Sequence, residues 1–183
     1  MEAEEVKKKR NRGFTLIELL AVIIILGILM AVAIPAMTKY IENSKKDAFW
    51  QTAKTYINAA RYGLLNDEFA GSDGTICSLP ATGGATVVPT SIIQLEKGSN
   101  KSAWNKTLSV SYVVCVDAGT ADKPKYVYYY AGKDSDNNGI ANPTQEDALN
   151  RGAVKRGGAS AAAQPSGTVS AGGKTYTIGQ VCS

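Results

Sequence analysis

The chain has 183 residues, with 20 lysines and arginines, 16 aspartates and glutamates, a net charge of +4 and no histidine. This length allows one domain of ordinary size with an appendage. The lack of histidine excludes Ser-His-Asp and Cys-His catalysis, as well as zinc sites with histidine ligands. The small net charge does not indicate a nucleic-acid-binding face, which would need a concentrated basic patch. We therefore expect a protein that is not an enzyme.

The first 38 residues divide into a short basic leader and an apolar helix. Residues 1–13 hold five lysines and arginines against three glutamates, a net of +2. Residues 14–38 hold a single charged side chain, Glu18, and a helix of about 25 residues at about 1.5 Å each spans the roughly 30 Å core of a bilayer. We predict a transmembrane helix over residues 14–38, with the leader in the cytoplasm and the rest of the chain across the membrane.

Two common membrane-targeting segments explain this start incompletely. A secretory signal peptide would be cleaved behind a short apolar stretch, for which Ala31-Val32-Ala33 is a candidate site. An uncleaved anchor fits the length and the charge asymmetry, but it leaves Glu18 unexplained, because a carboxylate within the apolar segment costs about 2.5–3.5 kcal/mol. A third kind of signal accounts for this residue.

The sequence GFTLIELL at residues 13–20 follows a basic leader and opens an unbroken apolar run, and it resembles the class III signal of type IV prepilins. That family includes pilins and the pseudopilins of type II secretion. The resemblance implies that a membrane peptidase cleaves between Gly13 and Phe14 and methylates the new amine of Phe14, so the apolar helix is kept. It also implies that Glu18 acts in assembly and that Pro35 is the helix-bending proline common in the family.

The chemistry of the motif supports the role of Glu18. Cleavage would place a positive amine on Phe14, one helical turn away, where the helix dipole also favours an anion. A carboxylate in apolar surroundings needs a partner, and the amine of its own or a neighbouring helix is one. Pro35 lacks the N–H that would bond to Ala31, so we expect either a bend required for packing or a kink that the helix tolerates.

The helix is expected to continue over residues 39–65 as an amphipathic one. Apolar and small residues recur there at helical spacing on one side, with charged residues elsewhere. This stripe comprises Ile41, Ala48, Phe49, Thr52, Ala53, Tyr56, Ile57, Ala60 and Leu64. Gly63 and the glycine-containing stretch 66–74 favour an end near residue 65. The pattern predicts one helix of about 50 residues whose second half needs a cover.

Residues 66–183 are predicted to supply that cover as a β-sheet head. The strand-forming runs, separated by turn residues, are 85–88, 92–95, 107–117, 125–131 and 175–182. Within residues 107–117, an apolar face of Val110, Tyr112, Val114 and Val116 alternates with a largely wet one, as in an antiparallel sheet laid on a helix. The expected fold class is α+β, type IV pilin-like, with a long N-terminal helix, transmembrane in its first half, packed on an antiparallel β-sheet head.

Residues 151–173 are rich in glycine, alanine and serine and are predicted to form a long exposed loop. The basic residues at its start are Arg151, Lys155 and Arg156. They could contact DNA or an acidic surface, but a solvated loop is the simpler interpretation.

Three cysteines, Cys77, Cys115 and Cys182, follow the membrane segment, on the side where disulfides persist. One bridge is expected, and one thiol is left over. The family resemblance favours Cys115–Cys182, whereas Cys77–Cys115 would tie the end of the helix to the same strand, and the sequence does not choose between them. A bridge that encloses several dozen residues contributes about 3–4 kcal/mol in the chain-entropy model.

The sequence DSDNNG at residues 134–139 matches the first half of an EF-hand calcium loop. A complete EF-hand is excluded because Gln145 stands at the twelfth position and a strand, not a helix, precedes the loop. A calcium loop without flanking helices would use Asp134, Asp136, Asn138, the Ile140 carbonyl and Glu146 or Asp147. The alternative is an Asn-Gly turn whose acidic residues aid solubility.

These features predict a structural subunit of a type IV pilus or related filament, made as a prepilin and assembled through its apolar helix. Its partners would be further copies in a homo-oligomeric filament, the prepilin peptidase, an assembly machinery of membrane platform and ATPase, and membrane lipid before assembly; nucleic acid is left open. The subunit would lie in the cytoplasmic membrane with its N-terminus inside, and then in an extracellular pilus or periplasmic filament. The alternatives are a pseudopilin or minor pilin of a type II secretion or DNA-uptake system, and a membrane-anchored calcium- or ligand-binding module.

Overall fold

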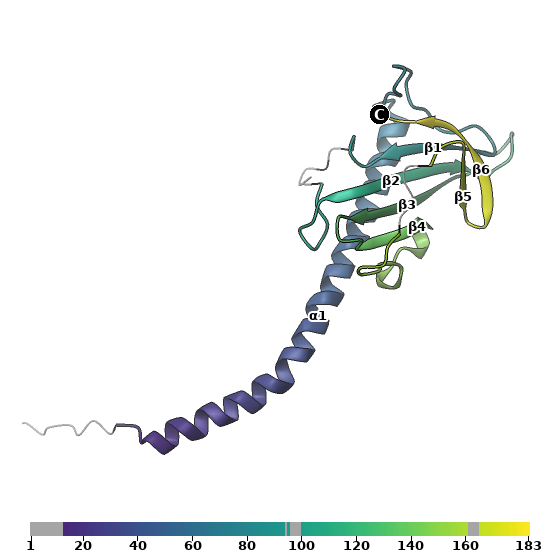
Figure 1. The fold of residues 1–183 in the computed structure, drawn as a ribbon. Helices are drawn as coiled ribbons and strands as arrows, with labels where there is room; N and C mark the ends of the chain where they lie inside the picture. The colour runs from purple at the N-terminus through teal and green to yellow at the C-terminus, as the bar shows by residue number, and fades with distance from the viewer. Residues whose placement is uncertain (1–12, 94, 96–99, 161–164) are drawn as a thin grey trace, which may run out of the picture. The chain divides into compact units, whose positions relative to one another are not determined.

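The computed structural model describes residues 13–93, 95, 100–160 and 165–183, so the predicted leader lies, except for Gly13, outside the described residues. The described chain contains one long helix, α1 (Leu16–Leu65), followed by six strands and two short 3-10 helices (Figure 1). It divides into two compact units, Met1–Ile41 and Glu42–Ser183. We call the second unit, which holds the C-terminal part of α1 and the sheet, the head.

The predicted helix of about 50 residues is confirmed, since α1 has 50 residues. The helix ends where the sequence changes from apolar residues to the polar and glycine-containing stretch after Leu65. Asp67 adopts a left-handed conformation with φ of 55°, and the N–H of Glu68 donates to the carbonyl of Gly63 at 2.9 Å. This is the closing hydrogen bond of a Schellman-type C-terminus, which satisfies a carbonyl that the last turn leaves free.

The head contains one six-stranded sheet in the order β4-β3-β2-β1-β6-β5. Its strands are β1 (Gly84–Pro89), β2 (Leu108–Asp117), β3 (Tyr126–Asp134), β4 (Gly139–Gln145), β5 (Thr168–Ala171) and β6 (Lys174–Val181). All neighbours are antiparallel except β1 and β6, which are parallel. The predicted strands at 85–88, 107–117, 125–131 and 175–182 are therefore confirmed, and β4 and β5 are additional.

The strand predicted at 92–95 is wrong for the residues described there. The N–H of Ile92 donates to the carbonyl of Pro89, and the N–H of Ile93 donates to that of Thr90, so the chain turns directly after β1. Ile93 is nonetheless buried, at 7% exposure. Its apolar side chain fills the core from a turn, which explains why hydrophobicity alone suggested a strand.

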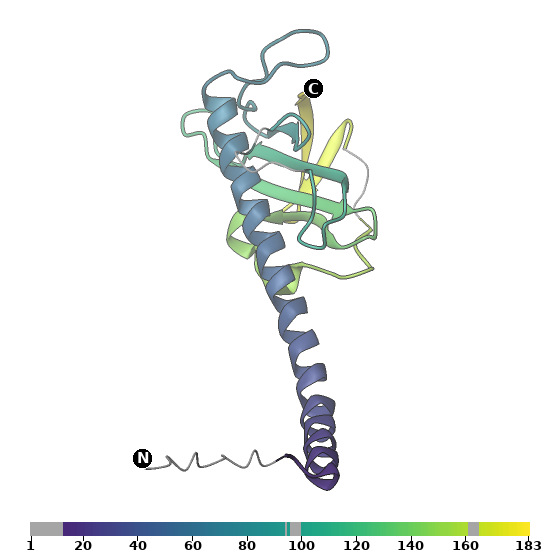
Figure 2. The ribbon, with the colours of Figure 1, turned by 90° about the vertical axis from the view of Figure 1, so that its left-hand side faces the viewer.

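One face of the sheet packs on the head part of α1 (Figure 2). The helix contributes Phe49, Ala53, Tyr56, Ile57, Ala60 and Leu64, all of them in the predicted stripe and all buried. The sheet contributes Val88, Val113, Cys115, Tyr128, Tyr130 and Ile140. Three members of the predicted stripe, Ile41, Ala48 and Thr52, are exposed instead. The buried side of the helix therefore includes fewer residues than the predicted stripe.

The second face of the sheet is buried as well, which corrects the expectation of one apolar and one largely wet face. In β2 the helix packs on the side of Val113 and Cys115. The more apolar side, with Tyr112, Val114 and Val116, belongs to a separate buried cluster that includes residues of β5 and β6. The sheet curls so that β5 contacts β4 (Figure 1). The β5–β6 hairpin covers this face, so the face can be apolar although it does not contact the helix.

The predicted exposed loop at 151–173 is corrected in part: most of its described residues are exposed, but the segment is not a continuous loop. Arg151–Ala153 form a 3-10 helix, η2, close behind η1 (Glu146–Ala148), and Thr168–Ala171 form β5. Val154 and Ala159 are buried, at 1% and 0% exposure. A composition rich in glycine, alanine and serine therefore indicated exposure for most of the segment, but it did not reveal the short helix, the strand or the buried side chains.

Candidate functional site

The apolar part of α1 is exposed on all sides. Every described residue from Gly13 to Ile41 is exposed, and the large apolar side chains among them range from 46% exposure at Leu26 to 91% at Phe14. By length and composition, α1 contains a segment that is long and apolar enough to cross a membrane. Because water solvates so much contiguous apolar surface poorly, this segment needs lipid or protein around it.

The predicted cleavage position precedes the first helical turn. Gly13 and Phe14 are not helical, whereas α1 begins at Leu16. A side chain built on Gly13 would meet no atom within 4 Å, and Phe14 is 91% exposed. The peptide bond between them therefore lies in an accessible, non-helical stretch.

Glu18 is held by the start of its own helix. Its Oε2 accepts hydrogen bonds from the backbone N–H of Thr15 at 2.8 Å and from the Thr15 hydroxyl at 2.7 Å. The N–H of Glu18 donates in return to Oγ1 of Thr15 at 3.3 Å. This reciprocal arrangement is a capping box, with Thr15 as N-cap and Glu18 three residues later. Both bonds end on Oε2, which leaves Oε1 available for a cation.

Pro35 lies inside α1, and the residues on either side of it are helical. Proline has no N–H to donate to the carbonyl of Ala31. The hydroxyl of Thr38 donates to the carbonyl of Pro35 at 3.0 Å, an i to i−3 bond of the kind that bends helices locally. A bend at this position stays a prediction.

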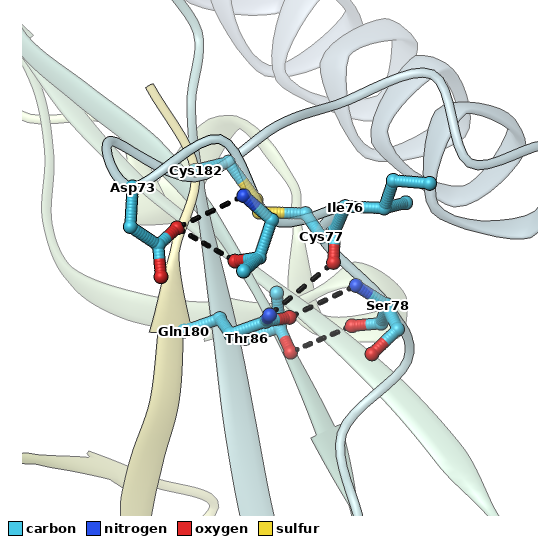
Figure 3. The surroundings of a disulfide bond; sticks show 8 residues. Asp73, Ile76, Cys77, Ser78, Thr86, Gln180 and Cys182 are labelled. Atoms are coloured by element: carbon cyan, nitrogen blue, oxygen red, sulfur yellow. Dashed lines mark hydrogen bonds between the residues drawn. A yellow bond between two sulfur atoms is a disulfide. The ribbon is translucent and has the colours of Figure 1, made fainter.

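The disulfide joins Cys77 to Cys182, and Cys115 is free, which corrects both pairings considered from the sequence (Figure 3). The Cα atoms of the bridged pair are 6.0 Å apart. Cys115 lies in β2, and β1 separates β2 from β6. Two strand spacings amount to roughly 10 Å, beyond the approximately 7 Å that a disulfide spans. Cys115 therefore cannot reach the end of β6.

Hydrogen bonds surround the bridge and tie the same two segments together (Figure 3). The side-chain amide of Gln180 donates to the carbonyl of Ile76 at 3.2 Å and accepts from the N–H of Ser78 at 2.9 Å. The hydroxyl of Thr86 donates to the carbonyl of Ser78 at 2.9 Å. The chain after α1 is thus held against β1 and β6 by side chains as well as by the covalent bond.

The predicted calcium loop is the turn of the β3–β4 hairpin. Asp134 is fully buried, and its carboxylate accepts hydrogen bonds from Ser102 at 2.6 Å, from the Asn138 side chain, and from the N–H groups of Asp136 and Asn138 at 2.9 Å each. Burial alone would raise the pKa of Asp134, but these bonds lower it below the usual value. Asn137 has φ of 58°, as expected for a turn residue.

The remaining predicted calcium ligands are not all brought to this turn. Asp136 pairs with Lys106 at 3.2 Å, and the Ile140 side chain lies in the core. Glu146 follows Gln145, which pairs with Tyr129 on β3. Tyr129 lies five residues before Asp134 on the same strand, so the two are about 17 Å apart. Among the residues that the structure describes, no three His, Cys, Asp or Glu side chains are grouped to hold a metal ion.

Three ion pairs fasten the segment Glu146–Arg156 to the head part of α1. Nε of Arg151 donates to Oδ1 of Asp47 at 2.8 Å, and the same guanidinium makes a second bond to Oδ2. Arg156 contacts Glu42 at 2.5 Å, and Arg61 contacts Glu146 at 2.5 Å. The hydrogen bond from Arg151 lowers the pKa of Asp47, with a smaller contribution from Trp50.

These pairs change the interpretation of the basic cluster predicted to contact DNA or an acidic surface. Arg151 and Arg156 are directed to acidic residues of the same chain, while Lys155 is exposed and its backbone pairs with Gly139. The pairing partners are more than 100 residues apart in sequence, so no local pattern predicted them. Thr15, by contrast, was readable from the Thr-x-x-Glu spacing of a capping box.

Comparisons with known proteins agree with the motif at the start of the chain. The family described as the prokaryotic N-terminal methylation motif matches residues 8–34. The type IV major pilin protein PilA of Myxococcus xanthus (strain DK1622) is 52% identical over 50 residues, which are 27% of this chain and 21% of the relative. The match therefore spans about a fifth of that relative's length. No solved structure matches the chain. The methylation motif, the pilin relative and the α+β fold with its long apolar helix together support a type IV pilin-like prepilin.

Proposed function

We propose that this chain is the structural subunit of a type IV pilus or a related filament, made as a prepilin, cleaved after Gly13 and methylated at Phe14. The observation that carries the proposal is the apolar segment of α1, which is exposed on all sides and begins with the methylation motif. Lipid would surround this segment in the membrane, and the same segment of other copies would replace the lipid in the filament. The subunit is the substrate of the peptidase and of the assembly machinery.

In this proposal, Glu18 pairs with the methylated amine of Phe14 in a neighbouring copy. The capping box supports a particular form of this pairing. Thr15 supplies two hydrogen bonds to Oε2, so the carboxylate already has partners within a single subunit. The partner amine would approach the remaining oxygen. Because ion pairs are strong where water is excluded, each added subunit would stabilise a charge of the previous one.

The mature N-terminus tests the processing step. Mass spectrometry of the protein purified from membranes or filaments should show a chain that begins with N-methylated Phe14. An intact leader would identify an uncleaved anchor, and cleavage behind Ala33 would identify a secretory signal peptide. Either of these results would refute the prepilin assignment.

Two variants of Glu18 test the assembly step. Glu18→Ala removes both the charge and the capping interaction, whereas Glu18→Gln keeps a side-chain oxygen for the capping box and removes only the charge. If charge pairing drives assembly, both variants should be cleaved yet poorly incorporated into sheared filaments. Normal filaments from Glu18→Gln would show that capping, not pairing, is the essential role.

A further inference from the structure

The β3–β4 turn ends at the one Asn-Gly pair of the chain, Asn138-Gly139. In such a pair, the backbone nitrogen of the glycine can attack the side-chain amide carbon of the asparagine, because glycine has no Cβ to hinder the approach. The new C–N bond closes a succinimide ring, and the side-chain nitrogen leaves as ammonia. Water then opens the ring and leaves aspartate or isoaspartate. The pair is therefore a potential deamidation site, and the surrounding structure decides when it reacts.

The folded head holds both reacting groups of this pair in hydrogen bonds. Asn138 is 4% exposed, and its side-chain nitrogen donates to both carboxylate oxygens of Asp134, at 3.1 and 3.0 Å. Its side-chain oxygen accepts from the N–H of Gly157 at 3.0 Å. The N–H of Gly139, whose nitrogen would make the attack, donates to the carbonyl of Lys155 at 2.9 Å. Ring closure would break these bonds within a buried site, so it requires that the turn first opens.

The packing of the turn favours both members of the pair. Gly139 has φ of 150°, and a Cβ at this position would lie 2.1 Å from the carbonyl oxygen of Gly132, so a larger residue does not fit. The side chain at position 138 donates to a carboxylate on one side and accepts from a backbone N–H on the other. The amide of asparagine does both, whereas an ionised aspartate offers only acceptors. The reactive dipeptide is thus a consequence of the packing.

Deamidation would remove contacts that hold the turn in its native form. An aspartate at position 138 would place a second carboxylate where the asparagine amide now lies, 3.0 and 3.1 Å from the carboxylate oxygens of Asp134. Two like charges at this distance in a buried site repel each other and lack donors. Isoaspartate would also lengthen the backbone by a methylene group and shift Gly139 from its close contact with Gly132. The deamidated turn would therefore not regain the native packing.

We propose that Asn138 deamidates only when the head opens, and that the product prevents the head from refolding. The rate of amide loss would equal the fraction of open molecules multiplied by the rate of the unprotected dipeptide. Folded subunits would keep the amide, and subunits that stay open would lose it irreversibly. The Cys77–Cys182 bridge, which opposes opening, would therefore also protect Asn138 chemically. This inference concerns the head alone and does not depend on assembly into a filament.

Time courses of deamidation test the protection by the fold. The full chain in detergent carries Cys115→Ser, so that no free thiol exchanges with the bridge. It is kept at mildly alkaline pH, either folded or unfolded in guanidinium chloride. Peptide mapping by mass spectrometry should show that Asn138 loses its amide at least about tenfold faster in the unfolded chain. Equal rates in the two states would overturn the proposal.

Refolding tests the effect of the product. After the denaturant is diluted, the fraction of chains that regains native tryptophan fluorescence should fall in step with the loss of the Asn138 amide. Chains held unfolded for the same time at mildly acidic pH, where the attack by the backbone nitrogen is slow, should keep the amide and refold. Deamidated chains that refold as completely as intact ones would refute the proposal.

Two variants separate the product from any other damage in denaturant. Asn138→Asp reproduces one product and should lose at least about 1 M in urea midpoint. The matched control is Asn137→Asp, which changes the same chemical group at an exposed position of the same turn, with φ of 58°. Aspartate tolerates this conformation, so the control should stay within about 0.5 M of the wild type. Equal midpoints for the two variants would contradict the role of the Asn138 amide.

Discussion

Removing the Cys77–Cys182 bridge should destabilise the head substantially. The bridge closes a loop with a sequence separation of 105 residues, which contains the whole sheet. In the chain-entropy model, a loop of this length reduces the entropy of the unfolded chain by about 16 cal/mol/K, or about 4.7 kcal/mol at 25 °C. Small domains have a total free energy of unfolding of about 5–15 kcal/mol. The bridge would therefore supply a large share of it.

Urea unfolding of the full chain in detergent can measure this effect. The chain has two tryptophans, and both lie in the head: Trp50 on α1, and Trp104 with its ring 5.9 Å from that of Phe49. Tryptophan fluorescence therefore reports unfolding of the head. For a urea dependence of about 2 kcal/mol per molar, the Cys77→Ser/Cys182→Ser variant should lose about 2 M in midpoint.

The matched control is Cys115→Ser, which keeps the bridge. This variant places a hydroxyl in the core, so its loss should be only that of one buried substitution, about 1–3 kcal/mol. Peptide mapping without reduction should recover Cys77 linked to Cys182. A linked peptide that contains Cys115, or a shift below about 0.5 M for the double variant, would refute the reasoning.

Three further measurements test other parts of the head. Gly172→Ala should be more destabilising than Gly173→Ala. Both glycines have positive φ, but only at position 172 would the new Cβ lie 2.6 Å from the Tyr129 hydroxyl. Equal urea midpoints for the two variants would contradict this contact. Cys115 should resist thiol reagents at neutral pH until the head unfolds, since burial raises its pKa to about 12, and rapid native labelling would show that β2 opens. The pKa of Asp117 is lowered because the N–H groups of Lys125 and Gly119 donate to its carboxylate. The ionised carboxylate therefore stabilises the fold above the ordinary aspartate pKa of about 3.9, and this stabilisation is lost as the pH falls through the lowered pKa. Asp117→Asn should therefore show a smaller loss of urea midpoint than wild type between pH 5 and pH 2, and an unchanged loss would contradict the assignment.

The start of the chain was predictable because its information is local. The GFTLIELL sequence, the absence of charge after Glu18 and the basic leader are properties of consecutive residues. The apolar run needs no partner from elsewhere in the chain to form a helix, since the backbone hydrogen bonds of a helix are internal. For the same reason, the helical stripe on the head part of α1 predicted six core residues correctly from spacing alone.

The disulfide and the ion pairs could not be predicted, because they depend on strand order. Sequence spacing shows that β1 and β6 are strands, but it does not show that β6 lies parallel to β1 in the sheet. That strand order brings Cys182 next to Cys77, and not next to Cys115. Arg151 and Asp47 are brought together in the same way, across 104 residues.

The sequence by itself determined where the methylation motif lies, which segment is apolar enough to cross a membrane, and where the long helix ends. Each of these follows from short-range chemistry, namely the methylation motif, hydropathy and helix periodicity. Only the tertiary structure decided which faces of the head remain uncovered. The β5–β6 hairpin buries the second face of the sheet, and ion pairs with the segment Glu146–Arg156 engage three charged residues of the head part of α1. Exposure depends on how all the elements pack together, so no local pattern of the sequence decides it.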